Sequence, residues 1–163
     1  MTVTLGEGNT PLLRAPRLSE RLGIELWLKW EGANPTGSFK DRGMSVAVTR
    51  AVEDGATTVV CASTGNTAAS AAAYAARAGL EAVIVVAAGG TASSKLVQVR
   101  AVGGRIVEVD GSFSAAYAHA EELAAKPGHV LVNSTNPHRI EGQKTAAFEI
   151  GRASCRERVS YHV

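Results

Sequence analysis

Residues 57–87 read TTVVCASTGNTAASAAAYAARAGLEAVIVVA, and this stretch decides the fold. Thr57–Ala62 and Ala82–Ala87 are short apolar runs rich in β-branched residues, a composition typical of buried strands. Between them, Thr67–Ala78 is rich in alanine, the strongest helix former, and it ends before Gly79. A strand, a helix and a second strand in so short a stretch predict a right-handed βαβ unit with parallel strands.

The same alternation continues on both sides of this unit. Helices are expected over Ser38–Asp54, Ser93–Val102 and Phe113–Lys126, with a further helix from about Pro137. Strands are expected over Leu26–Trp30, Arg105–Val109 and His129–Val132. The pattern predicts an α/β fold built from open parallel sheets with flanking helices.

Composition places the chain among ordinary globular proteins. Of its 163 residues, 45% are hydrophobic and 20% are charged, which argues against a disordered or fibrous chain. The longest uncharged run, residues 55–76, holds too many polar side chains to span a membrane. The net charge of +2 comes entirely from residues 151–163, so no nucleic-acid-binding face is expected. Neither a secretory signal nor a disulfide framework is visible, which predicts a cytoplasmic protein.

Lys40 is the first candidate for catalysis. It lies in residues 34–43 (NPTGSFKDRG), where Pro35 and Gly37 predict a tight turn and Ser38 begins a helix. The positive end of a helix dipole disfavours another positive charge, so it lowers the pKa of a lysine in the first turn. Such a lysine suits a Schiff base with a carbonyl compound, although a solvated surface lysine would have the same spacing.

Two loops are candidate anion sites. Ser63–Thr67 (STGNT) follows a strand and opens a helix, so its N–H groups and hydroxyls suit a carboxylate at the carboxyl edge of the sheet. Asn133–Arg139 (NSTNPHR) does the same after a later strand, and its amide, hydroxyl and guanidinium donors suit a phosphate. Taken singly, either loop is equally well explained as a helix cap or an Asx/Pro turn.

Together, these segments resemble the threonine synthase family, whose members are pyridoxal-phosphate enzymes of the tryptophan-synthase-β fold type (fold type II). The resemblance covers residues 5–149 and rests on Gly6–Leu12 (GEGNTPL), Asn34–Gly43, Ser63–Thr67 and Val132–Lys144 (VNSTNPHRIEGQK). The last of these segments favours threonine synthase. The lysine motif and the Ser63–Thr67 loop would fit threonine dehydratase or cysteine synthase equally well.

The resemblance implies a role for each matched residue. Lys40 would hold pyridoxal phosphate covalently, with Phe39 and Asn66 against the cofactor. The carboxylate of the amino acid would be bound by Ser63, Thr64 and Thr67, and the phosphate of O-phosphohomoserine by Asn133, Ser134 and Arg139. The implied enzyme is a carbon–oxygen lyase acting on phosphate, which makes L-threonine and phosphate from O-phospho-L-homoserine and water in threonine biosynthesis. The implied assembly is a homodimer with no metal, nucleic acid or membrane partner.

The family's chains continue for roughly as many residues again, so we expect this chain to be a truncated, N-terminal fragment that is inactive alone. Residues 1–54 are expected to begin the large cofactor-binding lobe, 55–132 to form a small α/β lobe, and 133–149 to return to the large lobe. The helical pattern dissolves after Phe148, and residues 150–163 resemble a translated sequencing adapter, although a genuine basic tail is the alternative. A non-catalytic α/β module that binds anions is the other open reading, but anion binding alone does not require Lys40.

Overall fold

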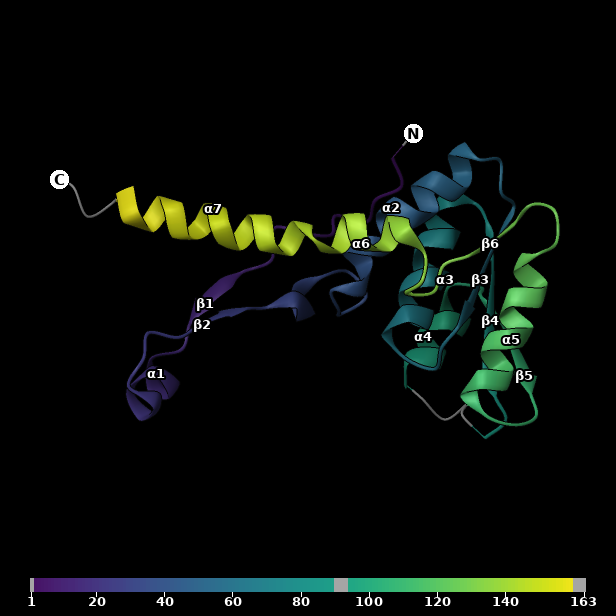
Figure 1. The fold of residues 1–163 in the computed structure, drawn as a ribbon, viewed down its shortest axis with the longest axis horizontal. Helices are drawn as coiled ribbons and strands as arrows, with labels where there is room; N and C mark the ends of the chain where they lie inside the picture. Colours follow the sequence, from purple (N-terminus) through teal and green to yellow (C-terminus); the bar gives the residue numbers. More distant parts are fainter. Residues whose placement is uncertain (1, 90–93, 160–163) are drawn as a thin grey trace.

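The computed structural model describes residues 2–89 and 94–159. Its body is a four-stranded sheet made of β3 (Thr58–Ala62), β4 (Glu81–Ala87), β5 (Arg105–Val109) and β6 (His129–Leu131). The strands lie in the order β5-β4-β3-β6, and every neighbouring pair is parallel (Figure 1). The predicted α/β class with a parallel sheet is therefore confirmed.

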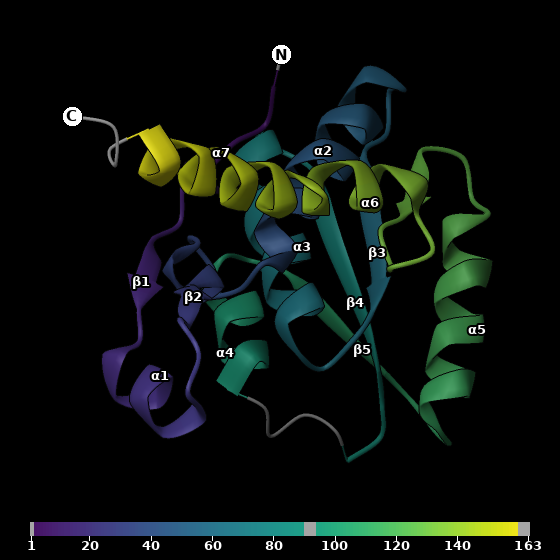
Figure 2. The same ribbon diagram turned by 60° about the vertical axis from the view of Figure 1, so that its left-hand side comes forward.

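Helices cover both faces of this sheet (Figures 1 and 2). Helices α2 (Lys40–Glu53), α3 (Asn66–Ala78) and α4 (Ser94–Ala101) pack on one face, and α5 (Phe113–Ala124) packs on the other. Alternate strand residues serve the two cores, since side chains of a strand point to opposite faces in turn. In β3, Val59 and Cys61 join the core under α3, whereas Val60 and Ala62 join the core under α5.

The predicted elements between Ser38 and Val132 are present, with their ends shifted by at most two residues. Shifts of this size are ordinary, because the last turn of a helix frays. The strand expected over Leu26–Trp30 is also present, as β2 (Trp27–Lys29). The expected helix start at Ser93 lies outside the described residues.

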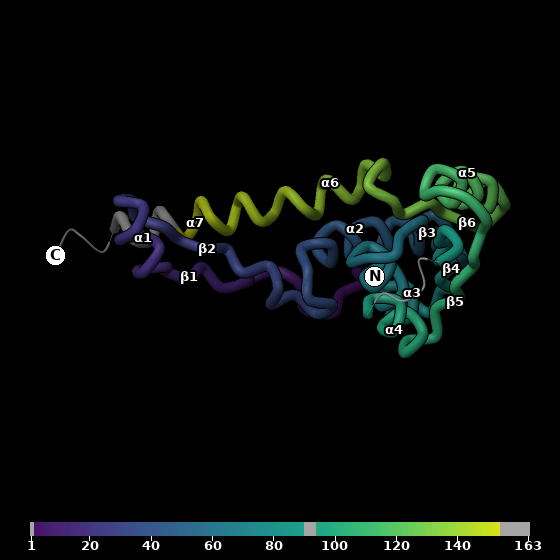
Figure 3. The backbone as a smooth tube through the Cα atoms, turned by 90° about the horizontal axis from the view of Figure 1, so that it is seen from below, coloured from purple at the N-terminus to yellow at the C-terminus, as the bar shows by residue number. Residues whose placement is uncertain are grey.

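A second part of the chain extends away from the sheet as an arm (Figure 3). In this arm β1 (Leu12–Arg14) pairs antiparallel with β2, and α1 (Pro16–Leu22) lies between them in the chain. The 3₁₀ helix η1 (Glu31–Ala33) then leads back toward the body, and α7 (Thr145–Val159) runs out from α6 (Pro137–Gln143) to the same side. The expected end of the helical pattern after Phe148 is wrong, because alanine, arginine and glutamate beyond it are good helix formers and α7 continues. Among the described residues, no helix has the length and apolar character needed to cross a bilayer.

Helices α2 and α6 come close to each other at two glycines, Gly43 and Gly142. A Cβ atom on Gly142 would lie 2.0 Å from the carbonyl oxygen of Arg42, and one on Gly43 would lie 2.5 Å from the carbonyl oxygen of Arg139. Both distances are far below van der Waals contact with backbone atoms that cannot rotate away. The two glycines therefore allow the backbones of α2 and α6 to approach each other directly.

Replacing Gly142 with alanine should destabilise the chain by roughly 3 kcal/mol or more, because the new methyl group forces the two helices apart. The measurement is thermal or denaturant unfolding followed by circular dichroism. Gly151→Ala is the matched control, since Gly151 also lies in a helix but a Cβ there meets nothing within 4 Å. That control should gain up to about 1 kcal/mol from helix propensity alone, so equal effects of the two substitutions would contradict a close crossing.

Candidate active site

The two predicted anion-binding loops meet at the carboxyl edge of the sheet, because β3 and β6 are adjacent and parallel. The side-chain amide of Asn133 joins them. Its Nδ2 donates to the carbonyl oxygen of Ala62 at 2.9 Å, and its Oδ1 accepts from the N–H of Ala62 at 2.9 Å. Asn133 thus adds one rung to the β3–β6 ladder with a side chain, a structural role that the sequence analysis missed.

Asn136 shapes the start of α6. Its Oδ1 accepts from the N–H of His138 at 3.0 Å, and its Nδ2 donates to the carbonyl oxygen of Leu131 at 2.9 Å. The first contact caps the helix, and the second ties that cap to the end of β6. This arrangement holds Arg139 in the first turn of α6.

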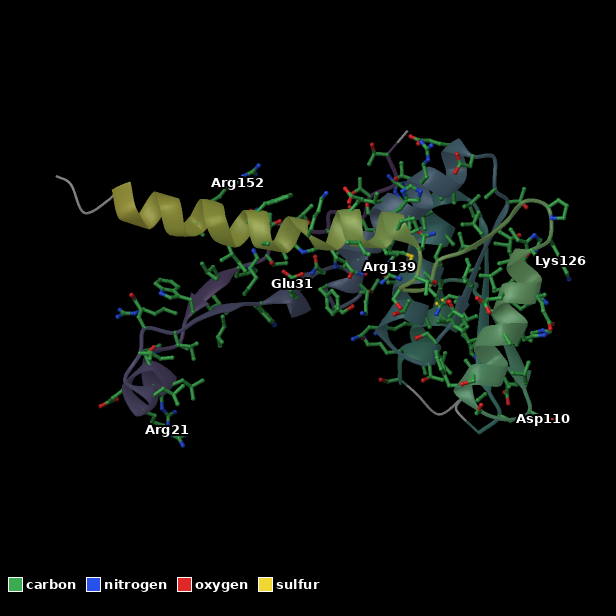
Figure 4. The ribbon with its side chains drawn as sticks, in the orientation of Figure 1. Arg21, Glu31, Asp110, Lys126, Arg139 and Arg152 are labelled. Carbon is green, nitrogen blue, oxygen red and sulfur yellow. The ribbon has the colours of Figure 1, made fainter. Side chains whose placement is uncertain are left out.

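Arg139 is a buried guanidinium with unused donors. The side chain is 1% exposed and lies where α6 meets α2 and the sheet (Figure 4). Its Nη1 donates to the carbonyl oxygen of Val132 at 2.7 Å, but no acceptor among the described residues pairs with Nε or Nη2. Burying an unpaired charged donor costs more than the roughly 1–3 kcal/mol of a neutral one, so the geometry suits an anionic oxygen as its partner.

Lys40 is the first residue of α2, the helix that packs against α6 and so against the helix that carries Arg139. Its Nζ lies 4.0 Å from the centroid of the Phe39 ring, and no hydrogen bond joins this Nζ to an acceptor among the described residues. Burial lowers the pKa of Lys40, and the positive charge of Arg139 lowers it further. The direction matches the expectation from the helix dipole, but the charge of Arg139 is a cause that spacing could not reveal.

The other predicted site residues differ in their exposure to solvent. Asn66 is the first residue of α3, and Asn66, Ser63 and Thr67 are half-buried. Thr64 and Ser134 are exposed, as is Phe39 at 40%. The Oγ of Ser63 accepts from the N–H of Gly65 at 3.1 Å, which shapes the loop in front of α3. The N-terminal ends of α2 and α3 are linked by a 2.6 Å hydrogen bond from Ser70 to Asp41.

A cluster around Arg42 is the largest polar feature that the sequence analysis missed. Arg42 is 3% exposed. Its Nε donates to Glu31 at 2.7 Å, its Nη1 to Glu149 at 2.7 Å and its Nη2 to the hydroxyl of Thr10 at 3.0 Å. Hydrogen bonds from Arg42, and then from Lys29, lower the pKa of Glu149 well below its usual range. The cluster fastens the arm to α2, and Glu31 marks its place in Figure 4.

This fold, together with a buried arginine that has two unused donor atoms and a lysine whose pKa is lowered by the charge of that arginine, defines an α/β protein with a candidate active site at the sheet edge. A family model described as "Pyridoxal-phosphate dependent enzyme" matches residues 3–163. The chain therefore belongs to the pyridoxal-phosphate-dependent enzyme family.

Several similar relatives are threonine synthases, as the motifs indicated. Threonine synthase from Bacillus sp. (strain ULM1) is 55% identical over 148 residues, which cover 91% of this chain and 42% of the relative. Threonine synthase from Mycobacterium leprae (strain TN) is 57% identical over 149 residues, 91% of this chain and 41% of the relative. The chain thus spans about two fifths of the length of these relatives.

Solved structures give the same fold. Threonine deaminase isoform 2 from Solanum lycopersicum superposes with a TM-score of 0.80 at 35% identity, over 88% of this chain and 40% of that one. A fungal L-serine ammonia-lyase from Rhizomucor miehei superposes with a TM-score of 0.82 at 28% identity, over 94% of this chain and 48% of that one. The predicted fold type II architecture is confirmed, in a chain that covers under half of these structures.

The described residues fit a pyridoxal phosphate molecule. Its aldehyde requires an unprotonated amine, and Lys40 combines a lowered pKa with an Nζ that no described acceptor engages. Anionic groups of the cofactor or its substrate require donors, and Arg139 offers two that are buried and unpaired. The chemistry of these two side chains therefore agrees with the cofactor that the family uses.

Replacing Arg139 with glutamine should raise the pKa of Lys40, because a positive charge that lowers it is removed. The pH dependence of Lys40 acetylation, followed by peptide mass spectrometry with the exposed Lys126 as internal reference, measures this change. Arg139→Lys keeps the charge and should leave the midpoint nearer that of the unsubstituted chain. A midpoint that falls, or that moves equally in both variants, would contradict electrostatic coupling between these residues.

Proposed function

We propose that the whole protein to which this chain belongs is a threonine synthase, which converts O-phospho-L-homoserine and water to L-threonine and inorganic phosphate. The observation that carries this proposal is the buried Arg139, whose Nε and Nη2 have no acceptor among the described residues. A phosphorylated substrate supplies oxygens for such donors beside the reactive amine of Lys40. The identity of 52–57% to several threonine synthases supports the same substrate.

The proposal assigns binding roles to the loops. Lys40 attaches the cofactor, with Phe39 and Asn66 against it. At the N-terminal end of α3, Ser63, Thr64 and Thr67 bind the carboxylate of the substrate, where N–H groups and the helix dipole favour an anion. The substrate's phosphate is bound by Asn133, Ser134 and Arg139. Asn133 can do so while it holds Ala62, because only one of its two amide hydrogens is used there.

Pyridoxal phosphate, when bound, supplies an electron sink that stabilises negative charge on the substrate's carbon atoms. The chain's own residues then control protons and leaving groups. When the Nζ of Lys40 is not bonded to the cofactor, its lowered pKa favours the unprotonated amine, which can take a proton from the substrate and return it later. Arg139 stabilises the charge that develops on the departing phosphate as the carbon–oxygen bond at the γ position breaks.

A threonine dehydratase is the second candidate, and the structural likeness to threonine deaminase from Solanum lycopersicum favours it. Dehydration of threonine needs no phosphate donor set. The buried Nε and Nη2 of Arg139, which have no acceptor among the described residues, would then have no substrate phosphate to bind. The phosphorylated substrate is therefore the better match to the site.

We also propose that the whole protein is a cytoplasmic homodimer. It acts on a small molecule and binds neither nucleic acid nor membranes. Support for the cytoplasm comes from Cys61, a free thiol that is fully buried in β3. Reduced cysteines are typical of that compartment.

Lys40 should carry the cofactor in the complete holoenzyme. Reduction with borohydride, followed by proteolysis and peptide mass mapping, should place the pyridoxyl group on the peptide that contains Lys40. Lys29, Lys95 and Lys144 serve as internal controls, because the same digest reports on them. Pyridoxyl label on one of these lysines in place of Lys40 would overturn the assignment.

Arg139→Ala in the complete enzyme should reduce kcat/KM for O-phosphohomoserine by about ten- to a hundredfold, since charge-assisted hydrogen bonds contribute roughly 1.5–3 kcal/mol. Cofactor content should be unchanged, and so should binding of phosphate-free L-homoserine, followed through the absorbance of the cofactor. A variant that loses cofactor but keeps its affinity for O-phosphohomoserine would show that Arg139 binds the cofactor's phosphate instead.

A further inference from the structure

Three hydrogen bonds converge on Asp41, the residue that follows Lys40. Asp41 is fully buried, at 0% exposure. Its Oδ2 accepts from the backbone N–H of Thr36 at 2.7 Å, and its Oδ1 accepts from the hydroxyls of Thr36 at 2.5 Å and Ser70 at 2.6 Å. We propose that Asp41 is the positioning residue for Lys40: it fixes the start of α2 against α3 and so sets where the lysine amine meets the cofactor.

On one side, Asp41 holds the turn that leads into α2. Gly37 adopts a φ of +83°, and its N–H donates to the carbonyl oxygen of Asn34 at 2.8 Å. Thr36 lies inside this turn, and its carbonyl oxygen accepts from the Nζ of Lys95 on α4 at 2.9 Å. Asp41 accepts hydrogen bonds from the N–H and the hydroxyl of Thr36. The turn is therefore hydrogen-bonded to both α2 and α4.

On the other side, Asp41 reaches α3 through Ser70. Ser70 follows Asn66 by four residues, so the two lie on one face of the helix a single turn apart. One turn further on, the hydroxyl of Tyr74 donates to Glu7 at 2.6 Å. This face of α3 therefore donates hydrogen bonds to two carboxyl groups. One belongs to Asp41, the residue after Lys40, and the other to Glu7 in the N-terminal GEGNTPL segment.

Hydrogen bonds matter for the position of α3 along α2, because most other buried side chains of α3 are small. The buried positions of α3 are mostly alanines, including Ala68, Ala71 and Ala75. Methyl groups contribute apolar area but interlock little, so apolar packing alone does not fix how far α3 slides along α2. Hydrogen bonds are sensitive to displacements of a few tenths of an ångström. The bond from Ser70 to Asp41 therefore sets the register between the helix that carries Lys40 and the helix that begins with Asn66.

The three partners also define which substitutions keep this geometry. In Asp41→Asn, the amide oxygen can accept from the N–H of Thr36, and the amide group can donate to both hydroxyls, which rotate to accept. Asp41→Ala removes all three contacts. Tyr74→Phe is the matched control, because it removes one part-buried hydrogen bond between the same helix and a carboxylate while leaving Asp41 untouched.

The experiment uses the complete holoenzyme and its Asp41→Ala, Asp41→Asn and Tyr74→Phe variants, well below their melting temperatures. The first readout is circular dichroism in the visible band of the bound cofactor, which depends on its orientation, together with the fraction trapped on Lys40 by borohydride. The second readout is kcat. Asp41→Ala should lose most of the cofactor ellipticity and about a hundredfold in kcat, the scale of a 1 Å misplacement, with a smaller change in KM. Asp41→Asn and Tyr74→Phe should stay within a few-fold of the unsubstituted enzyme.

Three results would overturn the inference: an unchanged cofactor band in Asp41→Ala, an equal loss in Asp41→Asn, or an equal loss in Tyr74→Phe. If Asp41→Ala does not fold, Ser70→Ala takes its place, with a loss on the order of tenfold in kcat and a weakened cofactor band expected. The inference depends on the proposed function only for the cofactor on Lys40. An enzyme that releases no phosphate from O-phosphohomoserine would refute the proposed substrate. The cofactor band is measured without substrate, so it would still test the role of Asp41.

Discussion

Direct contact between the backbones of α2 and α6 is the constraint on which the candidate site depends. Because Gly43 and Gly142 have no side chains, α6 can lie against α2 closely enough to carry Arg139 into the body of the protein. From there the guanidinium acts electrostatically on Lys40 and on Cys61, two groups from different elements. The lysine and the anion donors come from distant parts of the chain, and this crossing brings them together.

The four residues of the first turn of α2 point in four directions and contact different neighbours. Successive helix side chains diverge by about 100°, and the sequence Lys40-Asp41-Arg42-Gly43 uses each direction for a different partner. Lys40 faces Phe39 and the candidate site, Asp41 bonds to α3, and Arg42 bonds to the acids Glu31 and Glu149 of the arm. Gly43 leaves room for α6. One short segment therefore connects Lys40 to α3, to the arm and to α6.

Much of this could be predicted from the sequence, and the remainder could not for identifiable reasons. Periodicity revealed the strands and helices around Ser63–Thr67, and parallel strands require the loops that follow them to share an edge. The bonds between Asn133 and Ala62, and between Arg42 and Glu149, join residues that are 71 and 107 positions apart. Separations of that kind leave no periodic pattern. The resemblance implied that Arg139 binds a phosphate, but only the structure shows that two of its donor atoms are buried and have no acceptor among the described residues.

The bond between Asn133 and Ala62 also bears on the order in which the protein folds. Strands β3 and β4 can pair once the short helix between them has formed, whereas the loop after β6 reaches β3 across 71 positions. Contacts of long sequence separation form slowly, because closing the intervening loop costs entropy before the contact rewards it. On a ribosome that adds about 5–20 residues per second, Asn133 emerges several seconds after Ala62, the residue to which it bonds. The nascent chain can therefore complete much of its sheet while the candidate site still lacks its final geometry.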